Sequence, residues 1–215
     1  MKNRNIIETV KARNLSYLTE TALQNLQEQA IQANKLKGIF IEAGCALGGS
    51  SIVIANAKVW YKKLFIYDVF GMIPPPSNED AEDVHKRYET IKSGQSQGLN
   101  GDTYYGYVDD LLNTVKGNFA DCGVSLKNVN FVKGLYENTL KISHPVAFAH
   151  IDCDWYESVT TCLNQIVPNV VVGGIIVIDD YYDWSGCKKA VDDFFKDKQS
   201  SFEMIFGEKL TIIKK

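Results

Sequence analysis

The chain has 215 residues, which is enough for one domain with a complete hydrophobic core or for one domain that carries a large insertion. Its net charge of −3 argues against a nucleic-acid partner, because phosphate backbones are bound mainly by clustered Lys and Arg side chains. Residues 1–10 contain no apolar run typical of a signal peptide and no later segment is long enough to span a bilayer, so we expect a cytoplasmic protein without a membrane partner.

The first predicted element is an amphipathic helix between Ser16 and Gly38. Apolar side chains recur there every three or four positions, including Leu18 and Leu26. We expect residues 1–37 to form a helical cap, which would lie across the domain as a lid or as the contact face of a homodimer.

A buried strand and a glycine-rich turn follow in residues 37–51, KGIFIEAGCALGGSS, and lead into a predicted helix. Gly44, Gly48 and Gly49 allow a tight turn that a ligand can approach closely. The spacing differs from the Gly-x-Gly-x-x-Gly fingerprint of pyrophosphate sites, and Glu42 would repel a diphosphate. The turn therefore favours S-adenosylmethionine over NAD, although small residues that only pack the strand against the helix would give the same pattern.

After the helix, which is expected to end near residue 60, a second buried strand ends at Asp68, twenty-four residues after Gly44. An acidic residue at this place in a doubly wound sheet typically accepts hydrogen bonds from ribose hydroxyls. Asp68 is therefore the predicted ribose ligand. A turn cap would need the same residue type, so that alternative stays open.

About sixty residues separate Asp68 from the next predicted strand, roughly twice what a strand-helix-strand unit needs. We expect the excess, residues 71–120, to form an insertion that acts as a lid over the acceptor site. It contains a short charged helix, a flexible polar stretch and an apolar helical stripe that should dock on the core. Tyr104, Tyr105 and Tyr107 follow the polar stretch and are predicted to supply the aromatic contacts of the lid.

The second half of the chain alternates strands with helices, as in an α/β sheet covered on both faces. Strands are predicted at residues 129–132, 146–151 and 175–178, and helices at residues 156–167 and 186–198. Two short strands around Gly207 then predict a β-hairpin. The pattern predicts an α/β fold with a mostly parallel sheet.

Two of these strands end in pairs of carboxylates, Asp152 with Asp154 and Asp179 with Asp180. Because parallel strands place their carboxyl ends along one crevice, these acids should converge beside the ligand of the glycine turn. Clustered carboxylates repel one another unless a cation compensates, and oxygen ligands without a usable His and Cys set favour Mg²⁺ or a similar divalent ion. For each acid taken alone, capping the following helix is the alternative.

Three further candidates lie beside this crevice. His150 precedes Asp152 by two positions, so both side chains should point to the same face of their strand. His150 is a candidate base or a partner of the acids, and otherwise a packed histidine. Gly134 and Leu135, in the loop after the third strand, are candidates for the adenine side of the crevice.

Five motifs, in this order, resemble the macrocin O-methyltransferase family, the sugar-hydroxyl methyltransferases of macrolide antibiotic assembly and their relatives. The motifs are GIFIEAG…GGSS at 38–51, YDVFGMIP at 67–74, VKGLYENTL at 132–140, IDCDWYES at 151–158 and GG…IDDY at 173–181. The chain is short for that family, and residues 93–107 depart from its insertion. The resemblance implies a Rossmann-like class I methyltransferase with a mostly parallel seven-stranded sheet, helices on both faces and an antiparallel C-terminal hairpin.

The resemblance also implies the chemistry of the site. The cofactors would be S-adenosylmethionine and Mg²⁺, and the acceptor would be a hydroxyl of a small sugar or natural-product molecule. The metal ligands would be Asp152, Asp179 and Asp180. The cofactor contacts would be Glu42, Gly44, Gly48, Ser50, Asp68 and Asp152, together with Gly134 and Leu135.

The predicted function is methyl transfer to an acceptor hydroxyl in natural-product biosynthesis. Asp152 is predicted to ligate the metal and to accept the hydroxyl proton, with His150 as the alternative base. Two other functions stay open on the sequence: a metal-dependent hydrolase or hydroxylase on the same sheet, and a binding module for S-adenosylmethionine that has lost its chemistry.

Overall fold

The computed structural model describes residues 5–215, so the first four residues of the predicted cap lie outside the described part of the chain. The strands are β1 (Ile39–Ala43), β2 (Leu64–Asp68), β3 (Val129–Lys133), β4 (Val146–Ile151), β5 (Val170–Ile178), β6 (Phe202–Phe206) and β7 (Leu210–Lys214). They form one seven-stranded sheet in the order β3-β2-β1-β4-β5-β7-β6. β1 to β5 pair in parallel, and β7 runs antiparallel to both β5 and β6. The predicted sheet and its C-terminal hairpin are confirmed.

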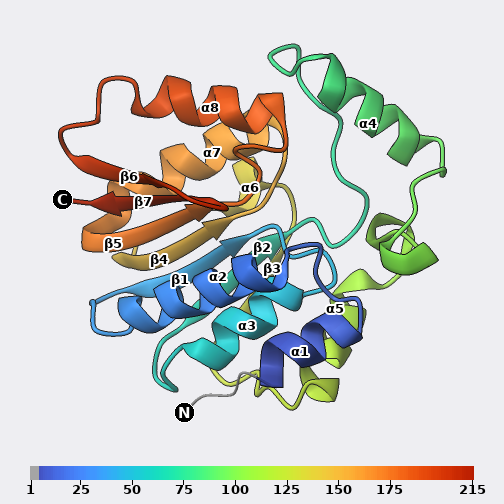
Figure 1. Cartoon of the computed structure of the whole chain (residues 1–215), viewed down its shortest axis with the longest axis horizontal. Coiled ribbons are helices and arrows are strands. Elements are labelled where there is room, and N and C mark those ends of the chain that lie inside the picture. The colour runs from blue at the N-terminus through green and yellow to red at the C-terminus, as the bar shows by residue number, and fades with distance from the viewer. Residues whose placement is uncertain (1–4) are drawn as a thin grey trace.

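Helices cover both faces of this sheet (Figure 1). They are α1 (Asn5–Ala12), α2 (Glu20–Ala33), α3 (Gly49–Ala57), α4 (Glu82–Lys92), α5 (Leu111–Asp121), α6 (Tyr136–Thr139), α7 (Tyr156–Ile166) and α8 (Ser185–Phe195), with short 3-10 turns η1 (Leu99–Gly101), η2 (Tyr105–Tyr107) and η3 (Val167–Asn169). One core lies under α1, α2, α3 and α5, and the other lies under α7 and α8. Within the described residues, no helix is long and apolar enough to cross a membrane.

The two cores arise from apolar strands that are buried on both sides. All six residues of β4 are buried, as expected for a central parallel strand with helices on each face. Phe40 and Phe148 face the α2 and α3 side, with ring centroids 5.3 Å apart, while Ile41 and Ala149 belong to the opposite core. Neighbouring residues of one strand therefore support different helix layers.

Three elements differ from the prediction. α1 lies within the predicted helical cap but was not predicted as a helix of its own, because eight residues show too few turns for a clear apolar repeat. α3 ends at Ala57 rather than near residue 60, because Lys58 adopts an extended backbone. β5 begins five residues earlier than predicted, at Val170, and Gly173 at φ +76° accompanies a shift in its register against β4.

The segment between β2 and β3 contains α4, η1, η2 and α5. α5 docks on the core as predicted, since Val115 and Phe119 are fully buried there. α4 lies outside both helix layers, beyond the ends of the parallel strands (Figure 1). The carboxyl ends of β1, β2, β4 and β5 therefore lie between the body of the domain and this segment.

Candidate functional site

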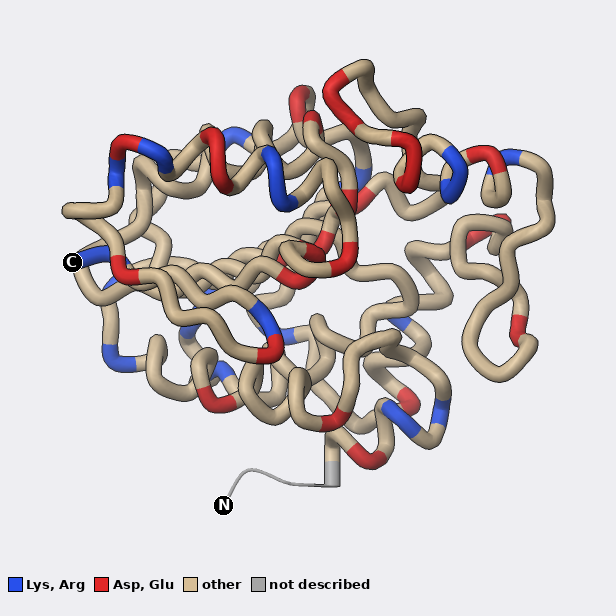
Figure 2. Tube along the Cα trace, turned by 45° about the horizontal axis from the view of Figure 1, so that its top comes forward, with Lys and Arg blue, Asp and Glu red and all other residues tan. Residues whose placement is uncertain are grey.

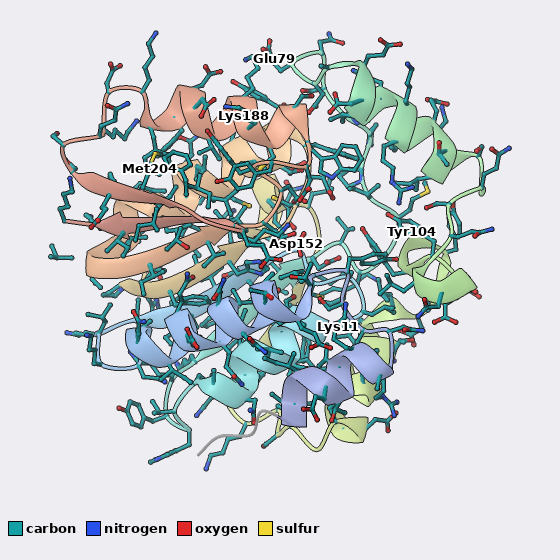
Figure 3. All side chains as sticks on the ribbon, in the orientation of Figure 1. Lys11, Glu79, Tyr104, Asp152, Lys188 and Met204 are labelled. Atoms are coloured by element: carbon teal, nitrogen blue, oxygen red, sulfur yellow. The ribbon has the colours of Figure 1, made fainter. Side chains whose placement is uncertain are left out.

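Two adjoining cavities lie at the carboxyl ends of the parallel strands. The larger has a volume of about 590 Å³ and the smaller a volume of about 360 Å³. Gly44, Asp68, Tyr105 and Asp152 line both cavities, so they form part of the boundary between the two spaces. In Figure 3, Asp152 lies near the centre of the molecule, between the sheet and the segment that carries Tyr104.

The turn between β1 and α3 is shaped by close packing of the protein on itself. A Cβ atom on Gly44, at φ +89°, would lie 1.7 Å from the carbonyl oxygen of Asp152. A Cβ atom on Gly48, at φ +90°, would lie 2.8 Å from Val115 of α5. Gly44 and Ser50 nevertheless line the larger cavity, whereas Gly48 lines neither cavity. The structure therefore does not place Gly48 where it was predicted to contact the cofactor.

Asp68 holds this turn against the end of β2. Its Oδ2 accepts a hydrogen bond from the backbone N–H of Cys45 at 2.8 Å, and its Oδ1 accepts one from Phe70 at 2.6 Å. Burial raises the pKa of Asp68, although these backbone donors oppose the shift. Asp68 thus acts as a turn cap and also lines both cavities.

Strained backbone collects around the same edge of the sheet. Ala46, Phe70 and Asp154 have φ values of 43°, 46° and 57°, and they follow β1, β2 and β4 respectively. For residues other than glycine, such left-handed conformations cost roughly 1–3 kcal/mol each and are concentrated at functional sites. The surrounding packing must therefore hold these turns in place.

Three of the predicted acids converge as expected. One carboxylate oxygen each from Asp152, Asp179 and Asp180 lies within 4.8 Å of the other two. Oxygen ligands around a Mg²⁺ ion, at about 2.1 Å from it, would be roughly 3–4 Å apart. Oδ1 of Asp179 is buried without a hydrogen-bond partner, which leaves it available as a ligand. The set therefore fits one hard divalent cation, and Figure 2 shows acidic residues on neighbouring segments near the middle of the view.

The acids differ in their electrostatic surroundings. Burial and the charge of neighbouring carboxylates raise the pKa of both Asp152 and Asp180 well above the ordinary value. Burial would raise the pKa of Asp179 as well, but the hydrogen bonds and positive charges of His150 and Lys209 outweigh burial and hold this pKa below its usual range. Without a divalent cation, burial and mutual repulsion thus disfavour the charged forms of Asp152 and Asp180.

The comparison with known proteins matches this chain over residues 11–206 to the macrocin O-methyltransferase (TylF) family. The protein belongs to that family. Its fold is the class I methyltransferase fold: the solved O-methyltransferase NovP superposes with a TM-score of 0.76 at 21% identity, over 94% of this chain and 82% of that one.

Two curated relatives of this macrocin O-methyltransferase family member come from Streptomyces. The 8-demethyl-8-(2,3-dimethoxy-alpha-L-rhamnosyl)-tetracenomycin-C 4'-O-methyltransferase of Streptomyces olivaceus is 28% identical over 187 residues, which are 84% of this chain and 63% of the relative. The demethyldecarbamoylnovobiocin O-methyltransferase of Streptomyces niveus is 25% identical over 185 residues, which are 80% of this chain and 64% of the relative. The chain thus spans less than two thirds of the length of either relative.

His150 in this family member is enclosed by protein. The side chain is fully buried and lines neither cavity, so it does not reach an acceptor. Its Nδ1 lies 3.2 Å from Oε1 of Glu42, and its Nε2 lies 3.8 Å from Oδ1 of Asp179. Burial lowers the pKa of His150, but Asp179 and Glu42 outweigh it and raise the pKa to about 10. The enclosed position of His150 gives no support to its alternative role as the base, which stays a prediction.

Glu42 and Gly134 also lie away from the cavities of the family member. Glu42 is fully buried and accepts a hydrogen bond from Ser50 Oγ at 2.5 Å, so any effect on the cofactor would pass through Ser50. Gly134, at φ +141°, donates its N–H to the carbonyl oxygen of Asp68 at 3.0 Å and lines neither cavity. Leu135 lines the smaller cavity, as the adenine prediction requires.

The three tyrosines predicted to belong to the lid have different positions in the structure. Tyr104 and Tyr105 line the larger cavity, with ring centroids 4.4 Å apart. Tyr107 lines neither cavity, and its hydroxyl donates to the carbonyl oxygen of Ile91 at 2.5 Å and accepts from the N–H of Ser96 at 3.2 Å. Tyr107 therefore ties η2 to the end of α4 and lines neither cavity, and its role as a lid residue stays a prediction.

Sequence reasoning missed two parts of the wall. Lys209, in the turn between β6 and β7, places Nζ 3.2 Å from Oδ2 of Asp179 and 2.9 Å from Oδ2 of Asp183. Residues 15–19 form another part, where the Thr19 hydroxyl hydrogen-bonds to Glu208. No local sequence pattern marks Lys209 or residues 15–19 as part of the site, because both come close to the acids only through contacts between segments that are far apart in the chain.

Proposed function

We propose that this protein is an S-adenosylmethionine-dependent, Mg²⁺-assisted O-methyltransferase that acts on a hydroxyl of a small sugar or natural-product molecule. The observation that carries the proposal is the convergence of Asp152, Asp179 and Asp180 in a cavity that also includes the turn after β1. Family membership and the names of the two Streptomyces enzymes support the reaction and the class of acceptor.

The cofactor would occupy the boundary between the two cavities. Asp68 would accept hydrogen bonds from the ribose hydroxyls, since it lies at the end of β2 and lines both spaces. Gly44 and Ser50 would hold the methionine end, and Leu135 would contact the adenine ring. When bound, the sulfonium group would supply an electrophilic methyl group to the larger cavity.

The metal would be held by Asp152, Asp179 and Asp180. When bound, the divalent ion would supply a Lewis acid that lowers the pKa of the acceptor hydroxyl. Lys209 would keep Oδ2 of Asp179 occupied, which leaves Oδ1, an oxygen without a hydrogen-bond partner, available to the ion. These residues thus fix which oxygen atoms are offered to the metal.

Asp154 is the carboxylate best suited to accept the proton. It lines both cavities but is not one of the three converging ligands. Burial and the charge of Asp179 raise the pKa of Asp154 to about 7 in the absence of a bound cation. Asp152, the acceptor predicted from the sequence, would be occupied as a metal ligand.

The segment 71–120 would limit the access of water to the larger cavity. It contributes Tyr104, Tyr105 and Arg87 to the cavity wall, and Arg87 lies 5.5 Å from the centroid of the Tyr104 ring. Seven carboxylates and only two basic side chains line this cavity, which disfavours acceptors with phosphate groups. We therefore infer a neutral polyhydroxylated acceptor.

Isothermal titration calorimetry with S-adenosylhomocysteine and with Mg²⁺ tests the proposal. We expect the wild type to bind both ligands. Asp68→Asn should lower the affinity for S-adenosylhomocysteine at least about tenfold, and Asp180→Asn should lower the affinity for Mg²⁺ by a similar factor. Asp109→Asn, at an exposed carboxylate, is the matched control and should change neither.

A hydrolase or hydroxylase would bind Mg²⁺ but not S-adenosylhomocysteine, and this result would overturn the proposal. A non-catalytic module would still bind S-adenosylhomocysteine. Its affinity for Mg²⁺ would be the same in the wild type and in Asp180→Asn. Methyl transfer to a panel of neutral glycosides then tests the acceptor class.

A further inference from the structure

A row of buried polar groups runs behind the wall of the larger cavity. Ser50 Oγ donates to Oε1 of Glu42 at 2.5 Å, and the same oxygen lies 3.2 Å from Nδ1 of His150. Nε2 of His150 lies 3.8 Å from Oδ1 of Asp179. Glu42 and His150 are fully buried, whereas Ser50 and Asp179 line the cavity. The row therefore begins and ends at the cavity and is enclosed by protein between these points.

The sheet itself fixes the middle of this row. Glu42 of β1 and His150 of β4 are direct partners in the parallel register, and His150 is in turn the partner of Val177 in β5. Asp179 follows Val177 by two positions, so its side chain projects to the same face. The spacing between these groups is thus set by strand pairing and not by a loop.

Three atoms of the row have no hydrogen-bond partner although they are buried: Oε2 of Glu42, Nε2 of His150 and Oδ1 of Asp179. A buried polar atom that lacks a partner typically costs about 1–3 kcal/mol. Apolar side chains of similar size would fill this place between the strands and α3 without that cost. Packing alone therefore does not account for a charged row here.

We propose that His150 is a positioning residue that couples the cofactor site to the metal site through Glu42 and Asp179. The inference rests on the proposed function, because it requires both ligands. A ligand that contacts Ser50 orders Glu42 and His150 from one end, and a cation on Asp179 orders the same pair from the other end. Whichever ligand binds second meets a row that is already ordered, so the two ligands favour each other.

Calorimetry on the full chain tests this coupling without an activity assay. The dissociation constant of S-adenosylhomocysteine is measured with and without saturating Mg²⁺. This ligand is used because it lacks the sulfonium charge that would repel the metal ion. For the wild type we expect Mg²⁺ to lower the dissociation constant at least about fivefold. For His150→Gln we expect a change of less than about twofold, while each ligand alone still binds.

Thr211→Val is the matched control. Thr211, in β7, is buried and pairs with Val177 of β5. It therefore lies on the same line across the sheet as Glu42 and His150, but it is not one of the polar groups of the row. Thr211→Val should keep the wild-type ratio between the S-adenosylhomocysteine dissociation constants measured without and with Mg²⁺. If circular dichroism shows that His150→Gln does not fold, Glu42→Gln cuts the row at the preceding group, and the same loss of coupling is expected.

Two results would overturn the inference. One is a wild type that binds both ligands with no effect of Mg²⁺ on the dissociation constant. The other is a fivefold effect that survives in His150→Gln, or in Glu42→Gln where that variant is used. A wild type that binds neither ligand would instead overturn the proposed function, so the two failures are distinguishable.

Discussion

The carboxyl edge of the sheet and the segment between β2 and β3 are held in place by different forces. The acids Asp152, Asp179 and Asp180 extend directly from β4 and β5, and strand pairing in a buried sheet sets their spacing. Within this segment α5 docks on a core through Val115 and Phe119, whereas α4 contributes no residue to either core, and the contacts of the α4 region with α7 and α8 include polar side chains. The proposed chemistry thus lies on the strand-paired region, and the proposed lid includes the α4 region, which lies outside both cores.

Three acidic residues dock this segment on the starts of α7 and α8. Oδ1 of Asp80 accepts the N–H of Tyr156 at 2.8 Å, in the first turn of α7. Oδ2 of Asp83 accepts the N–H of Ser185 at 3.1 Å, and Glu79 pairs with Lys189 at 3.0 Å. Figure 3 shows Glu79 beside the start of α4, near α8. Carboxylates at helix N-termini satisfy free N–H groups and the helix dipole, which favours this docking.

The largest expected effect is at the strand-paired region, in Asp152→Asn. Loss of one charged ligand should lower turnover more than about 100-fold, while the affinity for S-adenosylhomocysteine changes less than about threefold. Steady-state kinetics and calorimetry measure the two quantities. Equal loss of both would mean that Asp152 serves the structure and not the reaction.

The next effect is at the docking contacts, in Asp80→Ala. Asp80 is buried and also accepts from the N–H of Ser77 at 2.9 Å, so its removal leaves two N–H groups unpaired. We expect the free energy of unfolding in urea to fall by about 2 kcal/mol. Asp83→Ala, at an exposed position, is the control and should cost clearly less. Equal costs would contradict the assignment of Asp80 as the main anchor.

The pH dependence of stability should distinguish the acid cluster from the rest of the molecule. The pKa values of Asp152, Asp154 and Asp180 are raised in the folded state, so the folded protein binds their protons more tightly than the unfolded chain does. Their contribution is complete below about pH 4 and is lost as the pH rises through each folded-state pKa, which for Asp154 is about 7. The pKa of Asp179 is lowered, so this residue alone would make stability rise with pH. Three acids act the other way, and we expect their effect to be larger.

We therefore expect the melting temperature in EDTA to fall by a few degrees between about pH 5 and pH 8. Mg²⁺ should reduce this fall, because a bound cation offsets the carboxylate charges. Differential scanning fluorimetry at several pH values measures both curves. A melting temperature in EDTA that rises over this interval would contradict the raised pKa values.

The smallest expected effect is from Glu79→Gln. Glu79 and Lys189 are both well exposed, so solvent and salt screen their attraction. The melting temperature should stay within the scatter of the wild-type value at low and at high salt. A loss as large as that of Asp80→Ala would show that the outer ion pair, and not the buried carboxylate, anchors the segment.

The same contrast explains what could be predicted from the sequence. Apolar runs that end in Asp152 and Asp179 predicted both the strands and the meeting of the acids, because parallel strands share one edge. Asp68 was placed correctly at the end of β2, although its two hydrogen bonds to the turn could not be distinguished in advance from a ribose contact. Local patterns thus determined the positions of these side chains.

Contacts between distant segments could not be predicted in this way. Lys209 meets Asp179 only because β7 pairs with β5, and His150 is enclosed because Glu42 is its partner in β1. Tyr107 lies in the same tyrosine-rich run as Tyr104, and only its hydrogen bond to the end of α4 separates their positions. Burial and long-range pairing, which a single sequence does not display, decided these cases.

The central claim is that three aspartates hold a divalent ion beside the cofactor. Anomalous diffraction from crystals grown with Mn²⁺ and S-adenosylhomocysteine tests it most directly. The account predicts an anomalous peak bounded by Asp152, Asp179 and Asp180, with the S-adenosylhomocysteine ribose on Asp68. Ordered S-adenosylhomocysteine with no peak at these aspartates, or with a peak elsewhere, would contradict it.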